Sequence, residues 1–169
     1  MVKSTTYTLL IDGPSGSGKT TLANQIGAAL GMRVVHLDDF YPGWGGLAEG
    51  ARMVADDVLR LNNPGYRRWD WEQDAPGEWV ALSPDEDLVV EGVGAVTEAS
   101  IRAAKLRGDV DTVRVVADAE LRKDRALARD PGYAAYWEMW AAQEVALPRV
   151  AVDVEVERGR IKRGPTPRA

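Results

Sequence analysis

The chain has 169 residues, 45% of them hydrophobic and 28% charged, which fits one globular domain and excludes a largely disordered or collagen-like chain. Cysteine is absent and His36 is the only histidine, so disulfides, thiol nucleophiles, thiolate metal sites and multi-histidine metal sites are excluded. The net charge of −5 argues against nucleic acid as the main partner. Residues 1–8 lack a signal-peptide core and no apolar run approaches the roughly 20 residues of a membrane span, so we expect a cytoplasmic protein.

Predicted strands and helices alternate along the chain. Strands are expected where β-branched and apolar residues run together, at 6–12, 33–37, 87–91, 112–117 and 150–156. Helices are expected where apolar residues recur at helical spacing, at 19–30, 48–61, 93–106, 119–129 and 133–147. Residues 67–71 and 78–82 flank a Pro-Gly turn and predict a small hairpin. This order indicates a parallel sheet with helices on both faces, whose ligands bind at the carboxyl ends of the strands.

A glycine-rich segment joins the first predicted strand to the first predicted helix. Its sequence, GPSGSGKT over 13–20, fits the phosphate-loop pattern G-x-x-x-x-G-K-[ST] in the strand–helix context that this pattern requires. The glycines let backbone N–H groups point inward as an anion nest, and the helix adds its positive end. Lys19 is expected to reach the β- and γ-phosphates and the Thr20 hydroxyl to bind Mg²⁺. The predicted nucleotide-binding residues here are Gly13, Ser15, Gly16, Ser17, Gly18, Lys19, Thr20 and Thr21.

Carboxylates follow the second and third predicted strands. Asp38 and Asp39 come directly after 33–37, where a carboxylate can take a proton from an attacking hydroxyl. Such a base would favour a kinase over an ATPase or GTPase, and an acidic turn is the alternative interpretation. Glu91 ends the apolar strand 87–91, and an acid beside a phosphate loop suits Mg²⁺, directly or through its water ligands. The alternative for Glu91 is a strand-end cap.

Three arginines share one face of the predicted helix 119–129, because Arg122, Arg125 and Arg129 are spaced by three and four residues. They can form a mobile lid that closes over a triphosphate and stabilises the charge of the transferring group. Acidic residues on the same helix make a solvated ion-pair face the alternative. The segment 130–132, Asp-Pro-Gly, would supply the hinge.

Tryptophans gather in the region that follows the second strand, beside basic and acidic side chains. Their rings can stack a flat substrate while the charged groups read its polar edges, and ordinary packing of the hairpin is the alternative. The residues concerned are Trp44, Trp69, Trp71, Trp79, Arg67, Arg68 and Asp70.

Together these segments resemble the uridine kinase-like P-loop kinases, a group related to pantothenate kinase and phosphoribulokinase. The resemblance covers roughly residues 7–145 and rests on 11–20, on Asp-Asp-Phe-Tyr at 38–41, on Val-Glu-Gly at 90–92 and on the arginines of 122–129. It implies a P-loop NTPase three-layer α/β fold with a five-stranded parallel sheet in the order 2-3-1-4-5. It also implies that Asp38 is the base for the substrate hydroxyl and that Glu91 belongs to the Mg²⁺ shell. The candidate catalytic residues are Lys19, Asp38, Arg122 and Arg125, with Arg129 as a further nucleotide ligand, and the candidate acceptor-binding residues are Asp38, Tyr41, Arg68, Trp69, Asp70 and Trp71.

The resulting prediction is a P-loop kinase domain over 1–157, with a substrate-side hairpin near 63–86, a lid over 118–147 and a basic tail over 158–169. The tail is expected to be a solvated mobile end, or else a contact for phosphate or a partner. The predicted activity transfers the γ-phosphoryl group of ATP, with Mg²⁺, to a hydroxyl of a nucleoside or similar small molecule, with neither nucleic acid nor membrane as partner. A kinase for a sugar or pantothenate-like alcohol and a nucleotide-binding regulatory module without acceptor are the alternatives. The identity of the acceptor, the preference for ATP or GTP, the choice between Asp38 and Asp39 as the base, and the oligomeric state are left open.

Overall fold

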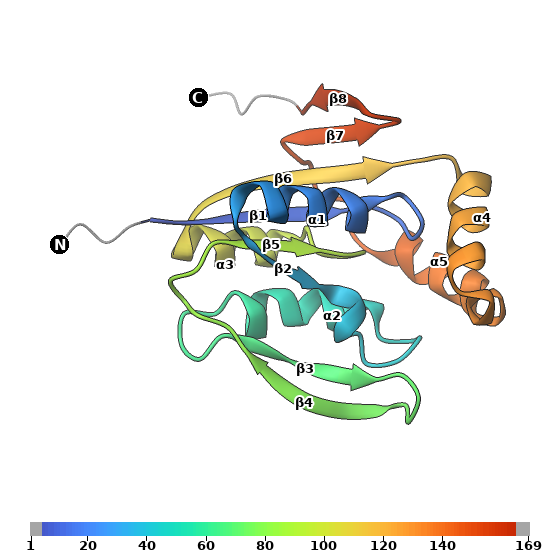
Figure 1. The fold of residues 1–169 in the computed structure, drawn as a ribbon, viewed down its shortest axis with the longest axis horizontal. Helices are drawn as coiled ribbons and strands as arrows, with labels where there is room; N and C mark the ends of the chain where they lie inside the picture. Colours follow the sequence, from blue (N-terminus) through green and yellow to red (C-terminus); the bar gives the residue numbers. More distant parts are fainter. Residues whose placement is uncertain (1–4, 165–169) are drawn as a thin grey trace.

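A mostly parallel sheet forms the centre of the computed structural model, which describes residues 5–164 (Figure 1). Its six strands run in the order β2-β5-β1-β6-β7-β8, and only β8 is antiparallel to its neighbour. The strands are β1 (Thr6–Asp12), β2 (Arg33–His36), β5 (Leu88–Glu91), β6 (Gly108–Val116), β7 (Val154–Glu157) and β8 (Arg160–Arg163). The expectation of five strands is therefore wrong, because the sheet has six. The sixth, β8, lies at the edge beside β7.

Helices cover both faces of this sheet, as the alternation of strands and helices predicts. Helix α1 lies on one face and α3 on the other, while α4 and α5 lie together beyond the ends of the strands (Figure 1). The helices are α1 (Lys19–Leu30), α2 (Leu47–Met53), α3 (Glu98–Arg107), α4 (Ala119–Arg129) and α5 (Trp137–Ala146). Helix α2 continues as a π-helical turn over Val54–Val58, and a 3₁₀ segment over Pro131–Tyr136 joins α4 to α5.

Two apolar clusters, one on each face, result from the alternation of side chains along the strands. Leu10 and Val90 belong to the larger cluster, which α2, α3 and α5 cover. Ile11 and Val89, one residue along the same strands, belong to the cluster that α1 covers. Burial on both faces explains why these strands read as continuous apolar runs in the sequence.

The helix expected over 93–106 begins later, at Glu98. Gly94 has a φ of +87°, and the N–H groups of Gly94 and Val96 bind the carboxylate of Asp12, so the chain after β5 is held as a loop. Thr97 then caps α3, since its hydroxyl accepts from Ser100 N at 3.0 Å. The helix expected over 133–147 likewise begins only at Trp137, because the Asp-Pro-Gly segment starts a 3₁₀ turn.

The hairpin predicted after α2 is present and forms a separate two-stranded sheet. Its strands are β3 (Gly65–Asp70) and β4 (Ala75–Ala81), and the turn between them covers 71–74. A register shift between Arg67 and Trp69 interrupts the pairing. The hairpin lies beside α2, on the side of the molecule away from β7 and β8 (Figure 1).

The basic segment after Glu157 is not a free end over its first residues. Arg158 and Gly159 form a turn with φ values of +48° and +73°, and β8 pairs with β7. β7 pairs with β6 on one side only, so its other side would expose unpaired backbone N–H and C=O groups. β8 pairs with these groups. The predicted tail is thus wrong for 158–163, and residues 165–169 lie outside the described part of the chain. Among residues 5–164, no helix combines the length and apolar character that crossing a bilayer requires.

Candidate phosphate-binding and acceptor site

The phosphate loop has the backbone geometry that an anion nest requires. Gly16 and Gly18 have φ values of +77° and +98°, which side-chain-bearing residues rarely adopt. At Gly16 a Cβ would also lie 2.2 Å from the carbonyl oxygen of Arg122, so glycine alone fits against α4. Lys19 follows at the start of α1 and donates from Nζ to Pro14 O at 3.3 Å. The predicted loop therefore curls around its own lysine at the N-terminus of a helix.

Asp12 fixes the start of this loop. Its Oδ1 accepts from Gly13 N at 2.7 Å and from Gly94 N at 3.1 Å, and its Oδ2 accepts from Val96 N at 2.8 Å. The carboxylate is buried, and three backbone donors replace its water. It ties the phosphate loop to the segment after β5. The sequence interpretation gave Asp12 no role, although an acid at the end of an apolar strand is a signal for one.

Glu91 and Thr20 lie together, as their positions at the ends of β5 and of the phosphate loop predict. Thr20 Oγ1 donates to Glu91 Oε1 at 3.0 Å, and His36 Nδ1 lies 2.6 Å from the same oxygen. This hydrogen bond raises the pKa of His36, against the opposing effect of burial. A hydroxyl beside a carboxylate supplies two oxygen ligands of the kind that Mg²⁺ prefers. Residues 5–164 contain no cluster of three or more His, Cys, Asp or Glu arranged for a metal, so phosphates and water would have to complete such a shell.

Asp38 faces the phosphate loop across a cavity of about 750 Å³. It lies in a 3₁₀ turn over Leu37–Asp39 that directly follows β2, at the carboxyl edge of the sheet. Solvent reaches its side chain through the cavity, but surrounding protein removes much of its hydration and raises the pKa of its carboxyl, which the charge of Lys19 partly offsets. Asp38 lines the cavity together with Lys19 and Thr20, whereas Asp39 is not part of the wall.

Aromatic rings form much of the remaining wall of the cavity. Trp44 stacks on Tyr136 at 4.5 Å and 4° and on Tyr133 at 4.9 Å and 24°. Trp71 lies 5.2 Å from Trp44 and donates from Nε1 to Asp38 O at 3.0 Å. Two further rings, those of Tyr41 and Trp140, complete the aromatic wall.

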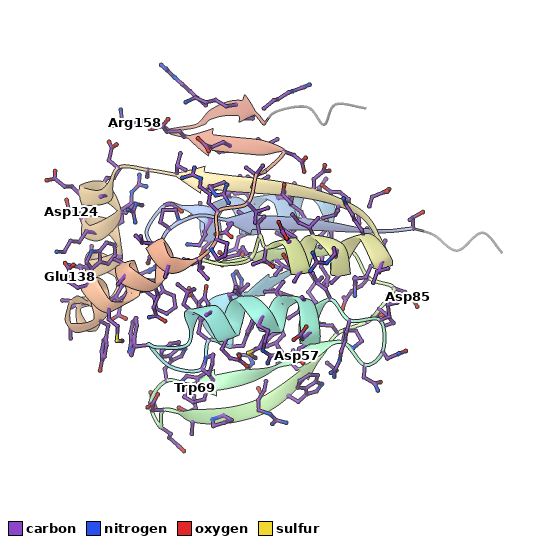
Figure 2. The ribbon with its side chains drawn as sticks, turned by 180° about the vertical axis from the view of Figure 1, so that it is seen from behind. Asp57, Trp69, Asp85, Asp124, Glu138 and Arg158 are labelled. Atoms are coloured by element: carbon purple, nitrogen blue, oxygen red, sulfur yellow. The ribbon has the colours of Figure 1, made fainter. Side chains whose placement is uncertain are left out.

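The hairpin contributes less to this cavity than expected. Trp71 lines it, but Arg68, Trp69 and Asp70 do not. Arg68 forms an ion pair of 3.5 Å with Glu78 on the facing strand, and the Asp70 carboxylate accepts from the backbone of the hairpin turn. Trp69 lies on the hairpin in Figure 2. Side chains on a strand alternate between its faces, and the hairpin twists its arginines away from the cavity.

The three arginines of α4 have different surroundings, although Arg125 and Arg129 both border a second hollow. Arg122 donates from Nη1 to Ser15 O at 3.2 Å and from Nε to Ala117 O at 3.1 Å. Arg129 lines the cavity, and Arg125 lines this second hollow of about 510 Å³ on the other side of the phosphate loop. A shared lid role for the three arginines stays a prediction.

The second hollow adds residues that the sequence did not suggest. It is bounded by the start of α1, the end of β6, α4 and the β7–β8 turn, and it adjoins Gly16 and Gly18 of the phosphate loop. Arg158 of this turn pairs with Asp118, the residue before α4. The glycine after Arg158 was a turn signal, but only the fold brings that turn to the loop. The residues concerned are Gln25, Leu121, Val156, Arg158 and Gly159.

Comparisons with solved structures show the fold of the chain. No protein-family model and no curated protein matches the sequence significantly. A candidate fructose transport system kinase from Silicibacter sp. TM1040 matches with a TM-score of 0.58 and 17% identity, over 92% of this chain and 91% of that one. A gluconokinase from Sinorhizobium meliloti 1021 matches with a TM-score of 0.52 and 13% identity, over 86% and 76%. A sugar kinase from Janibacter sp. HTCC2649 matches with a TM-score of 0.51 and 19% identity, over 90% and 85%.

These likenesses, with the phosphate loop between β1 and α1, define the fold as that of the P-loop kinases. The three-layer α/β fold that the motifs led us to expect is confirmed by these likenesses, apart from the strand count. At these identities the comparisons carry no assignment of substrate.

Proposed function

We propose that this protein is a phosphotransferase that moves the γ-phosphoryl group of ATP to a hydroxyl of a small molecule. The observation that carries the proposal is the shared cavity, which the phosphate loop lines on one side and Asp38 on another. A nucleotide-binding regulatory module would need the loop alone. A carboxylate with a raised pKa that faces the loop across an aromatic-walled cavity is what phosphoryl transfer to an alcohol requires.

In this proposal the acceptor oxygen attacks the γ-phosphorus while its proton passes to the Asp38 carboxylate. The bond between the γ-phosphorus and the bridging oxygen breaks, ADP leaves, and Asp38 later returns the proton to solvent. Lys19 neutralises charge on the β- and γ-phosphates, and the cationic Arg129 lies on the same cavity wall. Mg²⁺, when bound beside Thr20 and Glu91, supplies charge neutralisation at the phosphate oxygens.

The charges around the cavity favour an acceptor without a negative charge. Of its lining residues, only Lys19 and Arg129 are basic: Lys19 belongs to the phosphate loop, and Arg129 lies near enough to Asp38 for its charge to act on that carboxyl. Asp38 and Asp130 are acidic, and the remaining wall is largely aromatic. Outside the phosphate loop, a phosphate or carboxylate on the acceptor would meet Arg129 as the one lining cation and the acidic Asp38 and Asp130 beside it. A nucleoside or an uncharged sugar, with a flat face to stack on the rings, fits better than a nucleotide or a pantothenate-like acid.

The named neighbours support the kinase part of this proposal. All three neighbours described above carry the name of a kinase: a fructose transport system kinase, a sugar kinase and a gluconokinase. An uncharged sugar is therefore the second candidate acceptor. ATP as donor and a cytoplasmic location remain predictions.

The direct test is an ADP-release screen with MgATP and MgGTP against nucleosides, nucleoside monophosphates, neutral sugars, sugar acids and vitamins with free hydroxyls. We expect turnover with an uncharged acceptor, and loss of that turnover in Lys19→Ala without loss of folding, because Lys19 is the first residue of α1, where alanine is a good helix former, and among residues 5–164 its ammonium bonds only to Pro14 O. ADP release that does not depend on any acceptor would indicate an ATPase. Nucleotide binding without ADP release in any mixture would favour the regulatory module.

A further inference from the structure

A carboxylate from α5 occupies the phosphate loop. Glu144 Oε1 accepts from Ser15 N at 2.9 Å, and its Oε2 lies 3.9 Å from Arg122 Nη1. The Glu144 side chain is only 12% exposed. No step of the proposed reaction uses this residue. It lies on the last turns of α5, 129 positions after Ser15 in the sequence, so only the fold brings the two together.

Burial of the charged Glu144 carboxylate costs free energy, and its hydrogen-bond and charge partners offset only part of that cost. Burial raises the pKa of the Glu144 carboxyl, while the Ser15 N–H and the charges of Lys19 and Arg122 act in the opposite direction. The charged form is therefore held by the donors and cations that the loop also offers to phosphate groups. Glu144 takes the place of an anion at the loop.

A nucleotide phosphate competes with Glu144 in two ways. It needs the inward-pointing N–H groups of the loop, of which Ser15 N already has an acceptor. It also brings negative charge next to a buried carboxylate, and juxtaposed like charges in a desolvated site are costly. Lys19, which would serve the phosphates, contributes to the stabilisation of Glu144 instead.

The residue before Glu144 holds the acceptor side of the cavity. Gln143 Nε2 donates to Trp44 O at 2.7 Å, and Gln143 Oε1 accepts from Leu47 N at 3.2 Å. Trp44 belongs to the aromatic wall, and Leu47 begins α2. Two adjacent residues of α5 thus bind two parts of the site: Glu144 bonds to Ser15 of the phosphate loop, and Gln143 bonds to Trp44 and Leu47 on the acceptor side. Release of Glu144 therefore removes one of these two contacts of α5.

We infer that Glu144 is an internal anion that occupies the phosphate loop before nucleotide binds and is displaced by the phosphates. This inference rests on the proposed nucleotide-binding function and adds a residue that sets nucleotide affinity. Removal of its charge should tighten nucleotide binding, the opposite of what removal of an ordinary nucleotide ligand does.

The test is calorimetric titration of wild type and Glu144→Gln with MgATP and with magnesium tripolyphosphate, without acceptor. We expect about ten-fold tighter binding of both probes by Glu144→Gln, within the 5–150-fold range of typical couplings between two ligands. Tripolyphosphate should respond because only the phosphate chain meets Glu144. Glu144→Ala provides a second variant and should also bind more tightly, since it removes the competing acceptor entirely. Circular dichroism establishes that each variant is folded.

Glu138→Gln is the matched control, because Glu138 lies on the same helix with a side chain that is 89% exposed (Figure 2). Its affinity should equal that of the wild type. Unchanged or weaker binding by Glu144→Gln would overturn the inference, since Glu144 would then be neutral or would support the loop. If the wild type fails to bind MgATP, binding by Glu144→Gln alone still supports the inference. Failure of both overturns it together with the proposed function.

Discussion

The Arg122 guanidinium donates to the carbonyl oxygen of Ser15 at 3.2 Å, which ties the helix α4 to the phosphate loop. The same side chain donates to Ala117 O, at the end of the β6 segment that leads into α4. The cation is thus fixed at the loop by two backbone contacts rather than carried on a freely moving surface. This arrangement distinguishes Arg122 from the other two arginines of the helix.

Arg122→Ala should therefore lower kcat/KM for MgATP about 10²–10³-fold, the usual effect of removing one preorganised donor from a reacting phosphate or oxyanion. Arg125→Ala is the matched variant, because Arg125 lies on the same helix but lines the second hollow. We expect it to raise KM for ATP with little change in kcat. Steady-state kinetics at saturating acceptor measure both. An equal loss of kcat in the two variants would show that the helix moves further on closure than these contacts allow.

The Thr20–Glu91 pair predicts a specific dependence on magnesium. Glu91→Gln removes the negative charge and leaves the side-chain volume, so the Mg²⁺ concentration for half-maximal activity should rise about 10–100-fold. Calorimetric titration with ADP, with and without Mg²⁺, measures the same effect independently of turnover: the Mg²⁺-dependent gain in affinity should shrink in Glu91→Gln. Glu98→Gln, at the exposed start of α3, is the control. An unchanged magnesium requirement in Glu91→Gln would leave Glu91 as a strand-end partner of Thr20.

The acceptor wall predicts different roles for two tryptophans of the hairpin. Trp71 lines the cavity and Trp69 does not. Trp71→Ala should raise KM for the acceptor about ten-fold, since stacking of a base on an aromatic ring contributes roughly 1–3 kcal/mol. It should also remove much of the fluorescence change on acceptor binding. Trp69→Phe should leave KM within about two-fold. A larger effect from Trp69→Phe would mean that the hairpin changes position when the acceptor binds.

Short-range patterns predicted most of the site, and long-range contacts account for what they missed. The loop 13–20 was predictable because its glycines, lysine and threonine have fixed local roles, and Asp38 and Glu91 were predictable because they end apolar strands. The sequence could not separate Trp71 from Trp69, since alternation along a strand puts residues two apart on the same face, and only the structure shows that β3 ends at Asp70 and leaves Trp71 in the turn. Nor could the sequence place Glu144 at Ser15. Helical periodicity does not show which glutamate of a predicted helix contacts a distant loop.

The fold shows the same division. Alternating strands and helices predicted the parallel sheet, but β8 was missed because all four of its residues are exposed and three of them are basic, like a free tail. The late start of α3 depends on the Asp12 carboxylate, which holds the N–H groups of Gly94 and Val96. Residues 93–97, Val-Gly-Ala-Val-Thr, are mostly poor helix formers, so local propensity and this tertiary contact both favour a loop there.

Asp38 is the residue that decides between a kinase and a nucleotide-binding module. Asp38→Asn keeps the size of the side chain and removes the base, so kcat should fall about 10²–10⁴-fold while the Kd for MgATP stays within a few-fold. Asp39→Asn should do less, because Asp39 does not line the cavity. The kinetics of both variants with the acceptor found in the screen measure this difference. Equal activity of Asp38→Asn and wild type would remove the proposed base.

The raised pKa of Asp38 gives this prediction a pH dependence with a definite sign. The base must be ionised, so kcat falls as the pH drops through a pKa above the usual 3.8 of an aspartate. That acid limb should be absent from the residual activity of Asp38→Asn and present in Asp39→Asn. The same shift means that the ionised carboxylate destabilises the folded chain once the pH exceeds its folded pKa, because the folded state binds this proton more tightly than the unfolded state does. Asp38→Asn should therefore raise Tm at pH 7, and a lower Tm would show that contacts of the charged carboxylate outweigh its loss of hydration.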